Sequence, residues 1–309
     1  MCGVVSIVYA GDIVNLGTEA SNLLKKLEYR GYDSTGAAFI KEDGSVTLRK
    51  KVGAPSKVVE QLELAKYGGF KFIGQVRWAT YGAVTDINAQ PHEVNCLVHI
   101  VGAHNGNVSN TDKLKVFLSE NGHDVLSDND GEMVVHLVEH FYAALTAKKA
   151  PKTNDEKITV MIKAIRKAQK MIEGSYAACV TLPELPGVFA IKAGSSLYAG
   201  KGSDASGNFI VVSSDLTSIL SKTRFLIPMS EGEGIYFDSE NYKLFSLKED
   251  KEWVPKLSRS RLNIADIQLQ PKYHFFMEQE IFSSPKNIEN LMLYYFNSKE
   301  ERNFTLFSR

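Results

Sequence analysis

A strand that starts directly after the first two residues is the feature that most constrains this chain. Met1 and Cys2 are followed by Gly3-Val4-Val5-Ser6-Ile7-Val8-Tyr9. A short and continuous apolar run of this kind is typical of a buried strand. Such a strand would hold the N-terminus of the chain rigidly in place.

Cys2 is a candidate nucleophile. If an aminopeptidase removes Met1, Cys2 carries both a thiol and a free α-amine. These groups have ordinary pKa values of about 8.5 and about 8, so the amine can take the proton of the thiol near neutral pH. The alternative is a small cysteine buried in an edge strand, because cysteine is among the most frequently buried residues.

The patterning along the chain predicts an α+β fold. Helices are expected from Thr18, as N-cap, to a C-cap at Gly31, after Pro55, from Thr111 to Gly122, from Glu132 to Leu145, and from Ile158 to Gly174. Strands are expected at 36–40 and 46–49, joined by a turn at Asp43-Gly44, at 70–76 and 97–103, and repeatedly over 176–247, with a loop over 80–93. Because strands group at both ends and helices between them, we expect two packed sheets with helices on their outer faces.

The residue pattern changes after Leu247. A charged run at 248–252 and the absence of a clear period up to Ile264 predict a linker. A helix over 272–282 should end at Ser283-Ser284-Pro285, and one more helix should follow it. We therefore expect a main domain over 2–247 and a short helical C-terminal segment over 248–309.

Charge and cysteine content exclude several classes of protein. Lys plus Arg and Asp plus Glu both number 36, which gives no electrostatic footprint for nucleic acid or an anionic membrane. No stretch approaches the roughly 18 apolar residues of a membrane helix, and no basic leader precedes the first strand. The three cysteines show no paired spacing, which favours a reducing compartment. We expect a cytoplasmic protein.

Three short stretches carry candidate binding or catalytic residues. Arg77 and Thr80 offer donors for a carboxylate, although a surface arginine packed on Trp78 is the simpler interpretation. Asn105 and Gly106 are either an Asn-Gly hairpin turn or the two donors of an oxyanion hole. Asp130 is placed to cap a helix, and it could equally hold a substrate ammonium group.

Two further patterns are weaker. His136-Leu137-Val138-Glu139-His140 fits the H-x-x-E-H pattern of inverted zinc peptidases, but the sequence identifies no third ligand, and we expect no metal. The stretch Gly200 to Ala205 loosely matches a dinucleotide-binding loop. It leads into a strand, whereas a phosphate site needs a helix N-terminus, so we expect no nucleotide or other organic cofactor.

Five motifs in order resemble a known family. Cys2-Gly3-Val4-Val5, Glu28-Tyr29-Arg30-Gly31-Tyr32-Asp33-Ser34, Arg77-Trp78-Ala79-Thr80, His104-Asn105-Gly106 and Asn129-Asp130-Gly131-Glu132 are similar to those of the class II glutamine amidotransferases. Within that family, the Glu28–Ser34 run and the stretch Tyr273–Ile281 most resemble the glucosamine-6-phosphate synthases. The resemblance covers essentially residues 2–285.

The resemblance implies a fold, an activity and a role for each residue. The fold would be the four-layer αββα sandwich of the N-terminal-nucleophile hydrolases, and the activity would be hydrolysis of L-glutamine to glutamate and ammonia. Cys2 matches the nucleophile, and Trp78 matches a tryptophan that shields the site. The other matched residues are Asn105 and Gly106 for the oxyanion hole, Arg77 and Thr80 for the glutamine carboxylate, and Asp130 for its ammonium group.

The chain departs from the family pattern in three places. Tyr81 stands where the family usually has histidine after Ala-Thr, and Gln75 replaces a histidine before the arginine. The sequence also stops at Arg309 without a sugar-isomerase domain, so fructose 6-phosphate would be used only through a missing domain or a partner subunit. A glutaminase serving another acceptor, a silent glutamine-sensing module and a homo-oligomer remain open alternatives.

Overall fold

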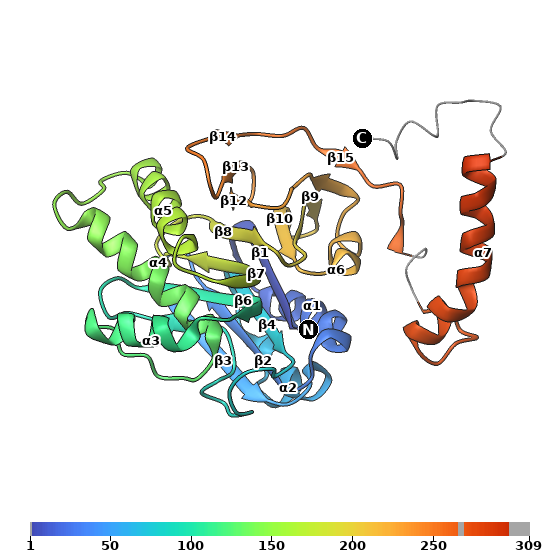
Figure 1. Ribbon diagram of the computed structural model, residues 1–309, viewed down its shortest axis with the longest axis horizontal. Coiled ribbons are helices and arrows are strands. Elements are labelled where there is room, and N and C mark those ends of the chain that lie inside the picture. Colours follow the sequence, from blue (N-terminus) through green and yellow to red (C-terminus); the bar gives the residue numbers. More distant parts are fainter. Residues whose placement is uncertain (1, 265–268, 297–309) are drawn as a thin grey trace. The chain divides into compact units, whose positions relative to one another are not determined.

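The computed structural model describes residues 2–264 and 269–296, which contain two antiparallel sheets (Figure 1). The first sheet has eight strands in the order β15-β11-β9-β10-β1-β4-β2-β3. Its strands are β1 (Gly3–Ile13), β2 (Ser34–Ile40), β3 (Val46–Val52), β4 (Gly69–Arg77), β9 (Tyr198–Asp204), β10 (Gly207–Ser213), β11 (Phe225–Ile227) and β15 (Ser258–Arg259). The second sheet has seven strands in the order β14-β13-β12-β8-β7-β6-β5. Its strands are β5 (His92–Val94), β6 (Ile100–Val108), β7 (Gly174–Thr181), β8 (Val188–Ala193), β12 (Glu233–Phe237), β13 (Tyr242–Ser246) and β14 (Glu252–Trp253).

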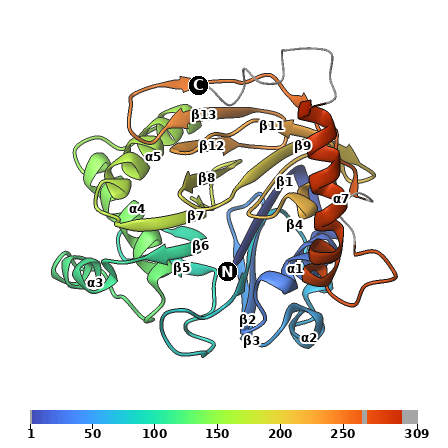
Figure 2. The same cartoon turned by 45° about the vertical axis from the view of Figure 1, so that its right-hand side comes forward.

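Helices cover the outer face of each sheet, as Figure 2 shows. The first sheet packs against α1 (Leu16–Leu27), α2 (Pro55–Gln61) and α6 (Leu216–Leu220), with short 3-10 helices at Glu28–Arg30 and Leu64–Lys66. The second sheet packs against α3 (Thr111–Glu120), α4 (Asp130–Thr146) and α5 (Asn154–Gln169). A third apolar cluster lies between the two sheets. This order of layers confirms the expected αββα sandwich.

Strand β1 is buried on both faces, as its apolar run predicts. Val4 and Val8 pack into the cluster between the sheets, whereas Val5, Ile7 and Tyr9 pack against the helices of the outer face. Strands β4 and β10 pair with β1 on its two edges. The strand alternates its side chains between two cores, so neither face tolerates polar residues without a partner. Its one buried serine, Ser6, donates from Oγ to the Phe72 carbonyl at 2.8 Å.

Several boundaries differ from the expected ones. Helix α1 starts at Leu16 with Asn15 as N-cap, so Thr18 lies in its first turn, and Gly31 is extended (φ −173°) rather than a left-handed C-cap. Residues His104 to Gly106 lie inside β6, so they do not form a hairpin turn. The short helix α6 lies within the region where we expected mostly short strands and turns.

The C-terminal part also departs from the expectation. The expected linker pairs with both sheets, because β14 adds to β13 and β15 adds to β11. The chain divides into two compact units after Arg261. Helix α7 (Phe276–Phe296) belongs to the second unit and runs through Pro285 as one helix, where two were expected. A proline removes one backbone donor from a helix without always ending it. Met1 and the expected segment at 297–309 lie outside the described residues.

Within the described ranges, no helix combines the length and apolar character needed to cross a membrane.

A buried lysine ties the two sheets together. Lys71 lies on β4 and is fully buried, and its Nζ donates to Thr181 Oγ1 at 2.9 Å and to the carbonyls of Leu182 and Gly187 at 3.2 and 3.3 Å. The Leu185 carbonyl lies 2.5 Å from the same nitrogen, so four acceptors share the three N–H groups of the ammonium. Burial lowers the pKa of this lysine from 10.5 to about 7. The lysine therefore replaces water as the donor for carbonyls in the turn between β7 and β8.

The low pKa of Lys71 should make the stability of the fold depend on pH. Between pH 7 and 10.5 the unfolded chain holds a proton that the folded chain does not, so raising the pH stabilises the folded state in this window. From pH 7 to 9, wild-type protein should gain on the order of 2 kcal/mol of unfolding free energy relative to Lys71→Met. Urea unfolding at both pH values measures this difference. Lys51→Met, at an exposed position on β3, is the control and should follow wild type; an equal pH response in Lys71→Met would contradict the prediction.

Candidate active site

The thiol of Cys2 lies at the start of β1, against the end of β4. The pairing of Gly3 with Val76 brings Cys2 beside the residues that follow β4. The Trp78 N–H donates to Cys2 Sγ at 3.4 Å, and the Trp78 carbonyl lies 3.4 Å from the same sulfur. Only 8% of Cys2 is exposed. The register of the sheet therefore fixes the position of the sulfur.

The surroundings of Cys2 keep its thiol protonated at rest. Burial raises the pKa of the thiol, and the charge of Asp130 adds to this effect. The Trp78 N–H and the charge of Arg77 act in the opposite direction without reversing the shift. A thiol with a raised pKa needs a base beside it before it can attack a carbonyl carbon.

The run Glu28–Ser34 holds the chain around Cys2. Arg30 donates from Nε to the Cys2 carbonyl at 3.1 Å, and Asp33 accepts from the Ala79 N–H at 2.8 Å. Gly31 passes so close to β4 that an added Cβ would lie 2.5 Å from the carbonyl carbon of Arg77. The motif therefore positions both the cysteine and the loop after Arg77, and only glycine fits at its centre.

Arg77 is buried, and its guanidinium binds the backbone of the following loop. Nη1 donates to the Ala83 carbonyl at 2.8 Å, and Nη2 donates to the carbonyls of Tyr81 and Gly82. Thr80 is exposed. These bonds use at most three of the five guanidinium N–H groups, but the side chain is buried, so the loop 81–83 that it contacts would have to move before a substrate carboxylate could bind.

Two aromatic side chains after Arg77 contact residues outside the loop. The Tyr81 hydroxyl donates to Asp112 on α3 at 3.0 Å, so this phenol is directed away from the Arg77 guanidinium. Trp78 is 41% exposed, and its ring contacts Tyr32 at a centroid distance of 5.3 Å. The loop therefore presents an aromatic pair to solvent beside Cys2.

Asp130 is the first residue of α4, but it does not cap this helix. Asn129 is the N-cap, because its side chain accepts from the Gly131 N–H at 2.9 Å. The Asp130 carboxylate turns to β6, where Oδ2 accepts from the Val108 N–H at 2.9 Å and lies 3.2 Å from His104 Nε2. Burial alone would raise the pKa of Asp130, but His104 and the Val108 N–H lower it overall. The site therefore contains a buried, ionised carboxylate.

His104 is oriented by Gln90. The backbone N–H of His104 donates to Gln90 Oε1 at 2.8 Å. This bond fixes the Gln90 amide so that its Nε2 faces the ring nitrogen His104 Nδ1 at 3.0 Å. An amide nitrogen only donates, so Nδ1 accepts and Nε2 carries the proton that faces Asp130. Gly131 leaves room for this ring, since a Cβ there would lie 2.2 Å from Nδ1.

Asn105 and Gly106 lie next to each other in β6. Asn105 is buried, and its side-chain amide makes no hydrogen bond to any other residue in the described part of the chain. Gly106 has a φ of +148°, and an added Cβ would lie 2.2 Å from the Ser175 carbonyl on β7. Gln75 on β4 donates to the His104 carbonyl at 3.4 Å, which links this part of β6 to the strand that positions Cys2.

The structure brings the candidate residues together from four segments. Cys2, Arg77 and Asp130 are close enough for each charge to shift the pKa of another. Sequence reasoning missed the roles of Arg30, Asp33, His104 and Gln90. Arg30, Asp33 and His104 belong to the motifs that carried the resemblance, whereas Gln90 lies in a loop without a pattern and offered no signal.

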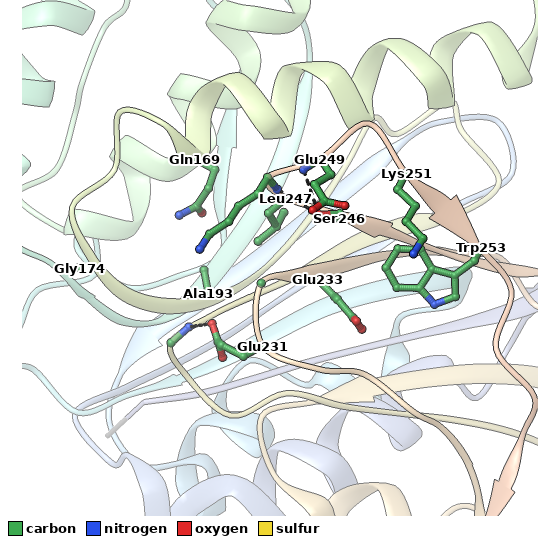
Figure 3. Close-up of a pocket in the computed structure, with 13 residues that line it drawn as sticks. Gln169, Gly174, Ala193, Glu231, Glu233, Ser246, Leu247, Glu249, Lys251 and Trp253 are labelled. Atoms are coloured by element: carbon green, nitrogen blue, oxygen red, sulfur yellow. Dashed lines mark hydrogen bonds between the residues drawn. The ribbon is translucent and has the colours of Figure 1, made fainter. Parts of the chain in front are cut away.

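A separate pocket of about 550 Å³ lies near the end of α5 and strands β12 to β14 (Figure 3). Its wall includes Glu231, Glu233, Lys248, Lys251 and Trp253, with the Lys251 ammonium 5.6 Å from the Trp253 ring centroid. None of the candidate catalytic residues lines this pocket, so its size says nothing about the chemistry at Cys2.

Several proteins that are similar in sequence share one name. The chain is 31% identical over 294 residues to glutamine–fructose-6-phosphate aminotransferase (isomerizing) of Sulfolobus acidocaldarius, covering 94% of this chain and 46% of that protein. The proteins of the same name from Sulfurisphaera tokodaii and Clostridium acetobutylicum are 32% and 33% identical, over 94% of this chain and 46% and 44% of theirs. The chain thus spans about half the length of these relatives. No family model matches it.

Solved structures show the same fold at lower identity. A glutamine phosphoribosylpyrophosphate amidotransferase from B. subtilis matches with a TM-score of 0.61 and 22% identity, over 80% of this chain and 49% of that one. An allosteric regulatory enzyme of purine biosynthesis matches with a TM-score of 0.63, also at 22% identity, over 80% of this chain and 49% of its own. At this identity the likeness supports the αββα fold.

Gly106 should not tolerate a side chain, both because its φ is positive and because an added Cβ would meet the Ser175 carbonyl. A second glycine separates the two effects. Gly207 also has a positive φ, +115°, but no atom lies within 4 Å of the position of its Cβ. Gly207→Ala should therefore cost only backbone strain, about 1–3 kcal/mol. Gly106→Ala should cost clearly more, because β7 must move away. Urea unfolding of both variants measures the difference, and equal losses would show that the contact with Ser175 is unimportant.

Proposed function

We propose that this chain, which is homologous to part of the glutamine–fructose-6-phosphate aminotransferases, hydrolyses L-glutamine to glutamate and ammonia through a thioester on Cys2. The observation that carries the proposal is the position of the Cys2 thiol. It is held by the sheet against Trp78, close to a buried cation, Arg77, and a buried carboxylate, Asp130. The fold and the names of the relatives support this activity.

The chemistry begins with removal of a proton from the thiol. After loss of Met1, the α-amine of Cys2 takes the proton from Sγ, and the thiolate attacks the side-chain amide carbon of glutamine. Charge develops on the amide oxygen, where the Asn105 side-chain amide and the Gly106 N–H donate. The ammonium of Cys2 then gives its proton to the leaving nitrogen, which departs as ammonia. Water attacks the thioester, glutamate leaves, and the thiol is restored.

To orient the substrate, the site must recognise both the ammonium and the carboxylate group on the α-carbon of glutamine. The ionised carboxylate of Asp130 would bind the ammonium group, supported by His104. Arg77 and Thr80 would bind the carboxylate, which competes with the carbonyls of residues 81–83 for the guanidinium. Binding of glutamine would therefore rearrange this loop, and Trp78 on the same loop would close over the site.

The acceptor of the ammonia is proposed from the relatives. Their name specifies fructose 6-phosphate, and the product would be glucosamine 6-phosphate. We assign the glutaminase reaction to the expected domain 2–247, together with the strands β14 and β15 that complete its two sheets. We propose that the rest of the segment up to residue 309 leads to an acceptor-binding part, in a further domain or a partner subunit. Three unpaired cysteines fit a cytoplasmic setting.

The nucleophile can be tested by substitution and by covalent labelling. Cys2→Ala should abolish release of ammonia from glutamine, because no other thiol replaces the attacking atom. 6-Diazo-5-oxonorleucine, an electrophilic glutamine analogue, should add to Cys2 alone, as read by peptide mass spectrometry, and Cys179→Ala should be labelled as wild type is. Labelling at Cys96 or Cys179 instead would refute the assignment. Tight glutamine binding by wild type without ammonia release would indicate a sensing module.

The oxyanion donors can be tested through the kinetics of Asn105→Ala. Removal of one such donor typically lowers kcat by about 10²–10³-fold. KM should change much less, because the hydrogen bond strengthens only as charge develops on the oxygen. Asn107→Ala, two residues along the same strand, is the control and should retain most activity. A steep rise in KM at unchanged kcat would instead make Asn105 a ground-state binding residue.

A further inference from the structure

A second group of ligating side chains lies further along α4. His136 and Glu139 come from this helix, His123 from the loop between α3 and α4, and Cys96 from the turn after β5. One potential ligand atom from each of these four residues lies within 4.8 Å of the other three. His123, His136 and Glu139 are buried, whereas Cys96 is partly exposed. None of the four takes part in the chemistry proposed at Cys2.

We propose that Cys96, His123, His136 and Glu139 together bind one zinc ion as a structural site. Thiolate, imidazole and carboxylate are the ligand types that zinc takes, and structural zinc sites use four protein ligands in a tetrahedron. Four protein ligands leave no open position for water or substrate. The site therefore differs from that of an inverted zinc peptidase, whose H-x-x-E-H pattern residues 136–140 of α4 also fit.

Three of the four ligands already point at one place. Glu139 Oε2 lies 3.0 Å from His123 Nδ1 and 2.9 Å from His136 Nδ1. In a tetrahedron with bonds of about 2.0–2.3 Å, neighbouring ligand atoms stand roughly 3.3–3.7 Å apart. Each of these two imidazole nitrogens therefore has to move away from Glu139 Oε2 by less than about 1 Å to admit the ion. The Cys96 sulfur lies within 4.8 Å of the other three ligand atoms, so it reaches the ion by a small inward shift. The two ring protons that now face Glu139 are displaced by the metal.

The surrounding groups match those of a metal site. Ligating histidines usually donate their second N–H to another group, which fixes the ring. Here His123 Nε2 lies 3.2 Å from His140 Nδ1, and His136 Nε2 lies 3.5 Å from Glu132 Oε1. The second pair lacks hydrogen-bond geometry, so His136 Nε2, although buried, has no hydrogen-bond partner among the residues that the structure describes. A small rotation of the His136 ring, made as its Nδ1 binds the metal, would bring Nε2 into hydrogen-bond geometry with Glu132.

Backbone donors support the remaining two ligands. Glu139 Oε1 accepts from the N–H groups of Leu97 and Val98 at 2.7 and 3.1 Å, which orients the other oxygen toward the histidines. Cys96 Sγ accepts from the Asp124 N–H at 3.3 Å, a contact that would stabilise a thiolate. A hydrogen-bonded His–Glu–His group alone would not require a sulfur beside it.

The bound ion would link two loops to α4, the helix that begins at Asp130. Cys96 and His123 lie in segments without regular structure, while His136 and Glu139 are one turn apart on α4. Zinc would thus fix α4 relative to the turn after β5 and the loop before α4. This role is structural, so it does not depend on the activity proposed at Cys2.

Cobalt substitution reads out the ligands directly. The chain 1–309, treated with a chelator, should bind one equivalent of Co²⁺ with tetrahedral visible bands and a near-ultraviolet thiolate-to-cobalt band. Zinc should displace the cobalt and raise the Tm. Cys96→Ala should lose the thiolate band, while Cys2→Ala and Cys179→Ala should keep it. His140→Ala should keep the band but weaken metal affinity by about 10–100-fold, as expected for a supporting residue.

Two results of the cobalt experiment would overturn the proposal. Folded wild-type protein that shows no thiolate band on addition of Co²⁺ excludes the site. A band that is lost in Cys2→Ala and kept in Cys96→Ala places the metal at the N-terminal cysteine instead. If Cys96→Ala fails to fold, the wild-type spectrum and the metal-to-protein ratio still decide between these results. Circular dichroism of each variant establishes that it is folded.

Discussion

Burial of β1 on both faces is the constraint on which the rest of the structure depends. The strand contributes to two apolar cores at once and pairs with β4 and β10 along its two edges. Its register cannot slip by one residue without exchanging the two sets of side chains. Cys2 precedes this strand directly, so its sulfur inherits a position that is fixed by the packing of the whole sandwich.

The environment of Cys2 determines the protonation state of its thiol. Burial keeps the thiol protonated, which protects it from oxidation, since the thiolate is the reactive form. The same burial makes a neighbouring base necessary, and the α-amine of a processed N-terminus is the base closest in the covalent structure. The Glu28–Ser34 motif contributes by holding the Cys2 carbonyl and the Ala79 N–H, not by touching the sulfur.

Helix α4 connects two groups of polar residues. Its first residue, Asp130, faces β6 and His104, whereas its later residues His136 and Glu139 face Cys96 and His123. Glu132 lies between them, where it accepts from the N–H groups of Leu126 and Ser127. The position of the helix therefore governs both the carboxylate proposed for substrate binding and the cluster proposed for zinc. Anchoring the loops around α4 would stabilise the substrate-binding end indirectly.

The sequence by itself determined the elements whose signals are local. The apolar run predicted β1, Asp43-Gly44 predicted the turn between β2 and β3, and Pro55 marked the start of α2. The motif residues also named the candidate site, because the order of motifs is a property of the sequence. Tertiary structure alone decided which partner each polar group takes: Asn129 rather than Asp130 caps α4, and Arg77 binds the loop carbonyls. Cys96 and His123 meet His136 and Glu139 only because the fold brings distant segments together, and no local pattern records such contacts.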